Sequence, residues 1–273
     1  MPHVRINNKT LNYTDTGSGY PIVFAHSYLW DNRMWAAQVA ELSKSYRCIS
    51  IDMWAHGESD PIEEDVYTVE QLADDYAAAL KEIGIAECHF MGLSVGGMIG
   101  AHLALKHPQL VKSLGLFGTY LGAEPEASKP QYEGLLNLFA AAGQFTPELV
   151  AQLAPFFFSP VTFEKKPHLA ENFKANLAAV PAEKLPAVVA LGRGILLHRT
   201  SILDQFPNIT IPTMVVVGED DMPRPPSEAK EMADLIPGAT LHVIPEAGHI
   251  SSVEQPEEIT KLIADQVLSK IAA

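Results

Sequence analysis

The chain has 273 residues, 47% of them hydrophobic, which is enough for one large α/β core carrying an inserted subdomain. Its 33 acidic and 19 basic residues give a formal net charge of −14, and such a surface repels both nucleic acid and anionic lipid. The chain contains no apolar run of about 18 residues, the length that spans a membrane, and its first residues lack the apolar stretch of a signal peptide. We therefore expect a cytoplasmic protein with neither nucleic acid nor a membrane as a partner.

Short apolar segments alternate with longer helical patterns along the chain, as in a mostly parallel sheet with helices on both faces. Strands are predicted at residues 4–7, 9–15, 21–25, 46–51, 88–91, 111–117, 213–217 and 240–244. The first two alternate with polar residues, which fits an antiparallel edge, whereas the middle strands are continuously apolar, as strands buried on both faces are. Helices are predicted at residues 34–43, 69–83, 95–107, 226–236 and 256–272.

The strand pattern stops between residues 122 and 205. This segment is helical in composition, but prolines from Pro125 to Pro186 interrupt it. Because a proline ends or kinks a helix, the segment is predicted to form several short helices. We interpret it as a helical cap inserted into a core made of residues 1–121 and 206–273.

One turn of the predicted core carries a chemical signal. The motif Gly92-Leu93-Ser94-Val95-Gly96 follows an apolar strand and precedes a helix rich in small residues. This is the G-x-S-x-G pattern in its strand–turn–helix setting, where a strained turn exposes the serine Oγ above the sheet. A Cβ at either flanking glycine would collide with the neighbouring strand or helix. The motif therefore predicts Ser94 as a nucleophile.

Three further stretches match the pattern of one family. Residues 23–30 are similar to an oxyanion loop, residues 52–59 to a D-x-x-G-H-G-x-S turn, and residues 218–221 with 247–249 to paired acid and histidine loops. With these motifs the chain resembles the α/β-hydrolase superfamily over nearly its whole length, and above all small carboxylesterases and 3-oxoadipate enol-lactonase-like hydrolases. The resemblance implies a mostly parallel eight-stranded sheet with helices on both faces and an inserted helical cap. Ser27 and Ala55 depart from it, because relatives usually carry glycine there.

The order serine, aspartate, histidine along the chain is that of α/β-hydrolases, and each candidate follows a predicted strand. Ligand sites in such sheets lie at the carboxyl ends of the strands. The resemblance implies that His249 takes the proton of Ser94 and that Asp221, the third residue after Gly218, orients the imidazole. Asp220 is the alternative acid.

The same resemblance assigns an oxyanion hole to two backbone N–H groups, those of Tyr28 and Val95. Loops beside Ser94 and the cap supply apolar side chains for the substrate, and those predicted to bind it are Leu29, Trp30, Trp54, Tyr120, Phe139, Met222 and Ile250. At least one aromatic ring of residues 156–158 is also expected at the cleft between cap and core. No ligand spacing indicates a metal site and no glycine-rich loop indicates a nucleotide, so we expect chemistry without a cofactor.

These residues predict a serine hydrolase that cleaves small carboxylic esters through an acyl-enzyme, with a small ester or lactone as its partner. An enol-lactonase of the 3-oxoadipate type is the alternative, and it would need a cation for the substrate carboxylate, with Arg193 and Arg199 as candidates. A perhydrolase or cofactor-free haloperoxidase fits less well, since such relatives often have proline where Leu29 stands. A non-catalytic receptor on the same fold would tolerate a lost triad member, and none is missing.

Overall fold

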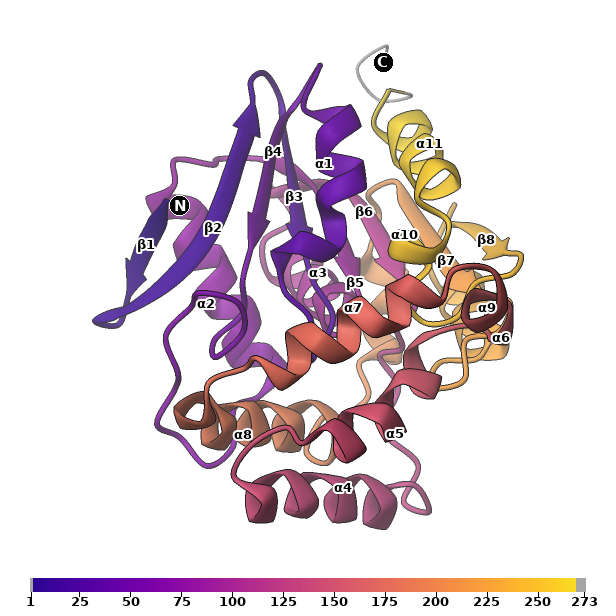
Figure 1. Ribbon diagram of the computed structural model, residues 1–273. Coiled ribbons are helices and arrows are strands. Elements are labelled where there is room, and N and C mark those ends of the chain that lie inside the picture. Colours follow the sequence, from indigo (N-terminus) through magenta and orange to yellow (C-terminus); the bar gives the residue numbers. More distant parts are fainter. Residues whose placement is uncertain (1, 269–273) are drawn as a thin grey trace.

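The computed structural model of the protein describes residues 2–268, and its centre is one eight-stranded sheet (Figure 1). The strands are β1 (His3–Ile6), β2 (Lys9–Gly17), β3 (Pro21–Ala25), β4 (Arg47–Ile51), β5 (Cys88–Leu93), β6 (Val111–Phe117), β7 (Thr213–Gly218) and β8 (Thr240–Ile244). They lie in the order β1-β2-β4-β3-β5-β6-β7-β8. β2 is antiparallel to β1 and to β4, and all other pairs are parallel. The predicted α/β-hydrolase sheet with an antiparallel edge is confirmed.

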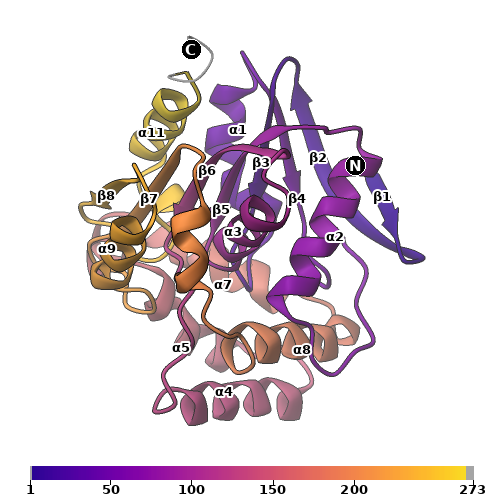
Figure 2. The ribbon, with the colours of Figure 1, turned by 180° about the vertical axis from the view of Figure 1, so that it is seen from behind.

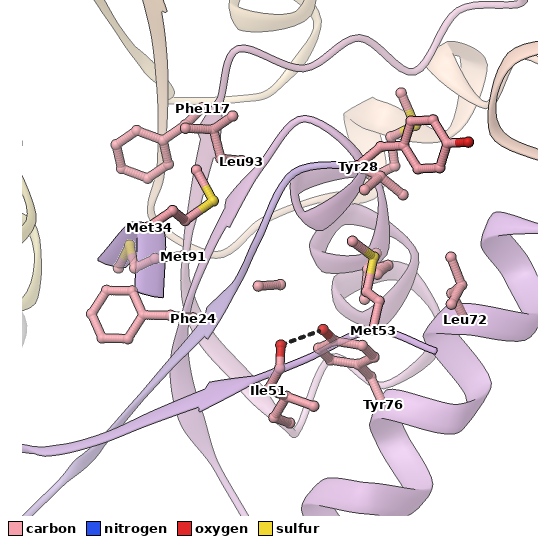
Figure 3. Close-up of a cluster of buried hydrophobic side chains, with 14 of the residues drawn as sticks. Phe24, Tyr28, Met34, Ile51, Met53, Leu72, Tyr76, Met91, Leu93 and Phe117 are labelled. Atoms are coloured by element: carbon pink, nitrogen blue, oxygen red, sulfur yellow. Dashed lines mark hydrogen bonds between the residues drawn. The ribbon is translucent and has the colours of Figure 1, made fainter. Parts of the chain in front are cut away.

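Burial of the strands follows from their place in the sheet. β5 and β7 are buried along their whole length and consist almost entirely of apolar residues and glycine, because helices cover both faces of the sheet there. The edge strand β1 instead alternates exposed and buried positions. Figure 3 shows the core beside β3 and β5, where Phe24, Met91 and Phe117 pack together. The Tyr76 hydroxyl, buried in the same region, donates to the Ile51 carbonyl at 3.1 Å.

Helices lie on both faces of the sheet, as Figures 1 and 2 show from opposite sides. One face carries α1 (Ala36–Leu42) and α11 (Pro256–Leu268), and the other carries α2 (Val69–Glu82), α3 (Val95–Lys106) and α9 (Pro226–Leu235). The helix predicted at 34–43 is two elements, because Asp31 caps a 3-10 turn, η1 (Asn32–Trp35), ahead of α1. The last residues of the helix predicted at 256–272, namely 269–272, lie outside the described residues. Among residues 2–268 no helix is long and apolar enough to cross a membrane.

The segment between β6 and β7 forms helices that lie over the carboxyl ends of the parallel strands (Figure 1). We call residues 122–205 the cap. Its helices are α4 (Lys129–Ala142), α5 (Pro147–Phe157), α6 (Pro160–Lys165), α7 (Pro167–Ala178), η2 (Ala182–Lys184) and α8 (Leu185–Leu196), and η3 (Leu203–Asn208) leads back to the core. Most cap prolines occupy the first or second position of a helix. A backbone N–H there would have no partner within the helix, so the N–H that proline lacks is not missed. Pro155 is an exception inside α5.

Candidate active site

Ser94 occupies a strained turn between β5 and α3. Its backbone has φ 56° and ψ −118°, a conformation that side-chain-bearing residues rarely adopt. Two hydrogen bonds hold the turn: the Ser94 N–H donates to the Phe117 carbonyl at 2.8 Å, and the Thr119 hydroxyl donates to the Ser94 carbonyl at 2.7 Å. The serine side chain is therefore fixed at the carboxyl end of the central strand.

The glycines on either side of this turn are required by close backbone contacts. A Cβ on Gly92 would lie 2.1 Å from the Gly96 carbonyl oxygen, and a Cβ on Gly96 would lie 2.2 Å from the Ala25 carbonyl oxygen. Both distances are far below van der Waals contact, and the neighbouring atoms are backbone atoms that cannot turn away. The sequence argument for these two glycines agrees with this packing.

Gly96→Ala is expected to destabilise the fold by several kcal/mol, because β3 and α3 must separate to admit the methyl group. Gly134→Ala is the matched control: Gly134 lies in α4, is exposed, and has open space where a Cβ would stand. Alanine there should stabilise the protein by up to about 1 kcal/mol. Urea unfolding of both variants measures the difference, and a Gly96→Ala protein as stable as the wild type would contradict the packing.

The acid and histidine loops meet beside this turn. Nδ1 of His249 lies 3.0 Å from both carboxylate oxygens of Asp221, and both side chains are almost fully buried. The backbone N–H of Arg224 also donates to Asp221 Oδ1 at 3.0 Å. Asp220, the alternative acid, turns to the cap and accepts from the Ser159 hydroxyl at 2.5 Å. Of the two aspartates, the structure brings Asp221 to the histidine.

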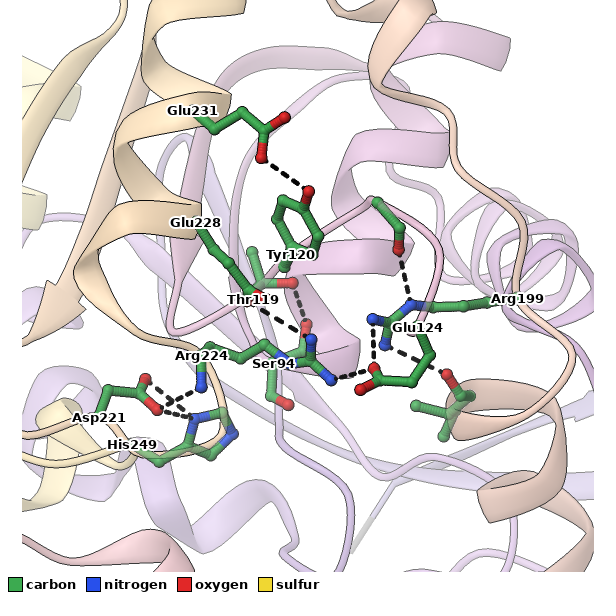
Figure 4. A network of polar contacts seen from close by, with 12 residues as sticks. Ser94, Thr119, Tyr120, Glu124, Arg199, Asp221, Arg224, Glu228, Glu231 and His249 are labelled. Carbon is green, nitrogen blue, oxygen red and sulfur yellow. Dashed lines mark hydrogen bonds and ion pairs between the residues drawn. The ribbon is translucent and has the colours of Figure 1, made fainter. Parts of the chain in front are cut away.

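His249 and Ser94 line the same cavity. In Figure 4 the free edge of the His249 ring faces the Ser94 side chain, while its opposite edge contacts Asp221. In the described residues no direct hydrogen bond joins Ser94 Oγ to the ring. Such contacts are often long before substrate binds and shorten in the reacting complex. The three side chains, far apart in sequence, therefore converge at the end of the sheet.

Two buried histidines hold the loop that the sequence assigned to the oxyanion hole. His26 Nε2 accepts from the Met53 N–H at 2.8 Å, and His56 Nε2 accepts from the Leu29 N–H at 3.1 Å. Their Nδ1 atoms lie 2.8 Å from the carbonyls of Ser27 and Trp54. Each ring is therefore neutral, with its proton on Nδ1.

Burial lowers the pKa of His26 to about 4 and that of His56 to about 3, whereas an unfolded histidine titrates near 6.5. Below pH 6.5 the unfolded chain therefore binds protons at these two histidines, whereas the folded protein does not. Stability present above pH 6.5 is lost as the pH falls toward 4, by about 1.4 kcal/mol per pH unit for each ring.

This loss predicts that the free energy of unfolding of His56→Gln depends less steeply on pH between 6.5 and 5 than that of the wild type. Urea unfolding at several pH values measures both slopes. His168→Gln, which alters an exposed histidine, is the control and should keep the wild-type slope. Equal slopes for His56→Gln and the wild type would contradict the lowered pKa of His56.

The oxyanion loop accommodates Ser27 without strain. The left-handed conformation in this loop falls on Leu29, with φ 66°, and Ser27 does not need it. Among the described residues, the backbone N–H groups of Tyr28 and Val95 donate to no protein acceptor, so both are free for a ligand. The Tyr28 hydroxyl donates to the Val188 carbonyl at 2.8 Å, which ties the loop to cap helix α8.

A cavity of about 640 Å³ opens between this site and the cap. Leu29 and Phe139, both predicted to bind substrate, line it, as do Phe156 and Phe157 of the expected aromatic segment. Most of the wall comes from the cap, and the cap residues that the sequence did not indicate include Leu135, Leu136, Leu138, Leu153, Ile195 and Leu196. Their apolar faces on α4, α5 and α8 were the available signal, but which faces meet depends on how the helices pack.

Five other residues predicted to bind substrate do not line this cavity. Trp54 is buried and donates to Asp75 at 2.7 Å, and the Tyr120 hydroxyl donates to Glu231 at 2.7 Å. Ile250 is fully buried and Met222 is 63% exposed. Trp30 stacks on Phe173 and lines a separate cavity of about 130 Å³. In each case burial, a specific partner or exposure to solvent directs the side chain elsewhere.

Two arginines contribute polar groups to the cavity wall. Arg199 and Arg224 donate to the same oxygen of Glu124, at 2.7 and 2.6 Å, and all three side chains are buried (Figure 4). Burial, followed by the charge of Arg224, lowers the pKa of Arg199 to about 10. Glu228 lies 3.4 Å from Arg224, so two carboxylates balance the two guanidinium groups. Arg193, the other predicted cation, donates to a backbone carbonyl away from this cavity.

The sequence of residues 20–256 matches the profile of the alpha/beta hydrolase fold, and the chain belongs to this family. A 3-oxoadipate enol-lactonase of Acinetobacter baylyi is 28% identical over 250 residues, which cover 91% of this chain and 88% of the relative. The solved structure of a thermophilic esterase from Thermogutta terrifontis, with malate bound, has a TM-score of 0.89 at 29% identity, covering 98% of this chain and 99% of the other. An enol-lactonase from Burkholderia xenovorans has a TM-score of 0.84 at 27% identity, covering 98% of this chain and 100% of the other.

Proposed function

We propose that this hydrolase cleaves small carboxylic esters through an acyl-enzyme, with Ser94, His249 and Asp221 as its catalytic triad. One observation carries the proposal: a serine in a strained strand–helix turn lines the same cavity as the histidine of a buried histidine–aspartate pair. This is the arrangement that nucleophilic catalysis by a serine requires, in which a base takes the hydroxyl proton and a third group orients the base.

In the acylation step, Ser94 Oγ attacks the ester carbonyl carbon while His249 Nε2 takes the hydroxyl proton. The carbonyl oxygen becomes an oxyanion, which the N–H groups of Val95 and Tyr28 bind; each such donor is worth about 2.7–4 kcal/mol of barrier. When the C–O bond to the alcohol breaks, His249 returns the proton to the leaving oxygen. A water molecule then attacks the acyl carbon with His249 as base, which releases the acid and restores the serine.

Asp221 fixes the tautomer of the base. Because its carboxylate accepts the Nδ1 proton of His249, the lone pair of the ring lies on Nε2, on the side that faces the serine. The carboxylate also stabilises the imidazolium that forms during each step. Burial of the pair increases this stabilisation, since water screens the two charges little.

The cavity wall favours an uncharged substrate of modest size. Its lining is largely apolar and includes leucine, isoleucine, phenylalanine and methionine side chains, which bind acyl or aryl groups by excluding water. The esterase relative with nearly the same chain length supports an ester as the substrate. The acyl chain and the leaving group would share the space beneath helices α4, α5 and α8.

An enol-lactone carrying a carboxylate is the second candidate, because Arg199 and Arg224 line the cavity and two enol-lactonases are among the relatives. Glu124 and Glu228 already balance both arginines, however, so an anion would have to compete with two protein carboxylates. This balance makes the uncharged ester the better substrate.

The test compares p-nitrophenyl acetate, butyrate and octanoate with 3-oxoadipate enol-lactone, using Ser94→Ala as the blank. We expect turnover of the short esters to exceed turnover of the lactone. A wild-type protein that hydrolyses only the lactone would replace the first proposal by the second. One that hydrolyses none of them above the blank, and does not react covalently with a fluorophosphonate, would refute both.

A further inference from the structure

Glu254 is a buried carboxylate that the proposed mechanism does not use. It ends the short helix α10 (Ser251–Glu254), five residues after His249, and it is 0% exposed. Its Oε1 accepts from the Gly248 N–H at 2.8 Å, and its Oε2 accepts from the Ser159 N–H at 2.8 Å and the Thr162 hydroxyl at 2.6 Å. Within residues 2–268 no ion pair reaches this carboxylate, so neutral donors hold it.

The two carboxylate oxygens join different parts of the molecule. Gly248 directly precedes His249, whereas Ser159 caps the start of α6 and Thr162 lies within α6. We call residues 158–159, between α5 and α6, the cap turn. The carboxylate therefore bridges the histidine loop and the cap. The Lys166 ammonium extends the bridge, since it donates to the backbone carbonyl of Glu254 at 2.5 Å.

The backbone of the cap turn is also in close contact with the histidine loop, residues 247–249. A Cβ on Gly248 would lie 2.6 Å from the Ser159 nitrogen and 2.8 Å from the Phe158 carbonyl carbon. The Ile250 N–H donates to the Phe157 carbonyl at 3.2 Å. His249 thus lies between two residues whose backbones are fixed by the cap.

The same turn reaches the acid loop. The Ser159 hydroxyl donates to Asp220, the neighbour of Asp221, and the Asp220 N–H donates to the Ala247 carbonyl at 2.9 Å. The loops that supply the acid and the base are therefore connected to each other and to the cap through Ser159 and Glu254.

We propose that Glu254 is a positioning residue for His249: its carboxylate holds the Gly248 peptide against the cap turn and thereby sets the imidazole beside Ser94. The inference rests on the proposed function, because it concerns the same histidine. A carboxylate suits this role, since three donors converge on it and each of its oxygens is an acceptor. A glutamine offers one acceptor oxygen and an NH₂ group, which must face at least one of the donors.

The test is Glu254→Gln in the full chain, assayed with p-nitrophenyl butyrate. We expect kcat to fall at least tenfold while KM changes less than threefold, because the cavity wall that binds the acyl group stays in place and only the base is displaced. The rate of covalent reaction with a fluorophosphonate should fall by a similar factor, and this readout does not depend on the choice of substrate.

Thr162→Val is the matched control, since it removes one cap contact to the same carboxylate and leaves the Gly248 and Ser159 contacts in place. Its kcat should stay within threefold of the wild type. Glu254→Asp is the second variant, in case Glu254→Gln does not fold: it keeps the charge but is one methylene too short to reach both loops, so its kcat should also fall.

A folded Glu254→Gln or Glu254→Asp protein whose kcat equals that of the wild type would overturn the positioning role. An equal loss of kcat in Thr162→Val and Glu254→Gln would overturn it too, because attachment of the cap alone would then explain the effect. Absence of both turnover and covalent labelling in the wild type would instead refute the proposed function.

Discussion

Ser94→Ala is expected to lower kcat for p-nitrophenyl butyrate by about 10⁴-fold or more, because no other group can form the acyl-enzyme. The fold should persist, since the backbone hydrogen bonds of residue 94 to Phe117 and Thr119 do not involve its side chain. Steady-state kinetics and thermal unfolding of the same preparation measure both.

Ser27→Ala is the matched control for this variant. Ser27 is buried and, like Ser94, lines the cavity, and its hydroxyl makes one long contact, 3.5 Å to the Tyr28 carbonyl. Its removal should leave kcat within about tenfold of the wild type, since the oxyanion N–H groups are unaffected. If Ser94→Ala kept more than a tenth of the wild-type rate, Ser94 would not be the nucleophile.

Asp221→Asn should lower kcat by about 10⁴-fold through the tautomer of His249. Both oxygens of Asp221 are engaged by donors, one of them by the N–H of Arg224 as well as by the ring. An asparagine has only one acceptor oxygen. If that oxygen keeps the Arg224 contact, its NH₂ group faces Nδ1, and the proton of the ring moves to Nε2, where it blocks proton transfer from Ser94.

The adjacent aspartate makes this prediction specific. In Asp220→Asn the amide oxygen can still accept from the Ser159 hydroxyl, so kcat should stay within about threefold of the wild type. Both variants change the charge by the same amount in the same loop. A larger loss in Asp220→Asn than in Asp221→Asn would assign the acid to the other residue.

Sequence patterns predicted those parts of the molecule that short-range chemistry determines. The turn at Ser94 needs two glycines and a strand–helix junction within five residues, and these are visible in any sequence that carries them. The eight strands were predicted to within a few residues. The middle strands are buried on both faces and therefore leave an apolar run with clear limits. The choice of Asp221 over Asp220 rested on the family resemblance alone, since a shift of one residue in a loop would reverse which side chain meets the histidine.

The cavity wall could not be predicted in the same way. Trp54 was expected at the substrate as part of a loop beside Ser94, and Tyr120 as part of the cap. Their polar atoms instead donate to Asp75 of α2 and to Glu231 of α9. The apolar faces of the cap helices that do line the cavity are recognisable only once their packing is known. Glu254 carries no local motif, and its role depends on a contact with Ser159, 95 residues away.

The ion pairs at Glu124 limit how this hydrolase can be recombined with its relatives. Exchange of residues 122–205 alone would remove both Glu124 and Arg199 and leave Arg224 buried beside Asp221 with its principal partner gone. Arg224 would keep Glu228, but at the longer distance of 3.4 Å. Breaking a buried ion pair by removing one partner costs up to about 3–5 kcal/mol, a large fraction of the stability of a typical domain. A chimera that exchanges the cap must therefore exchange residue 224 as well. The segment to be exchanged is thus discontinuous in the sequence.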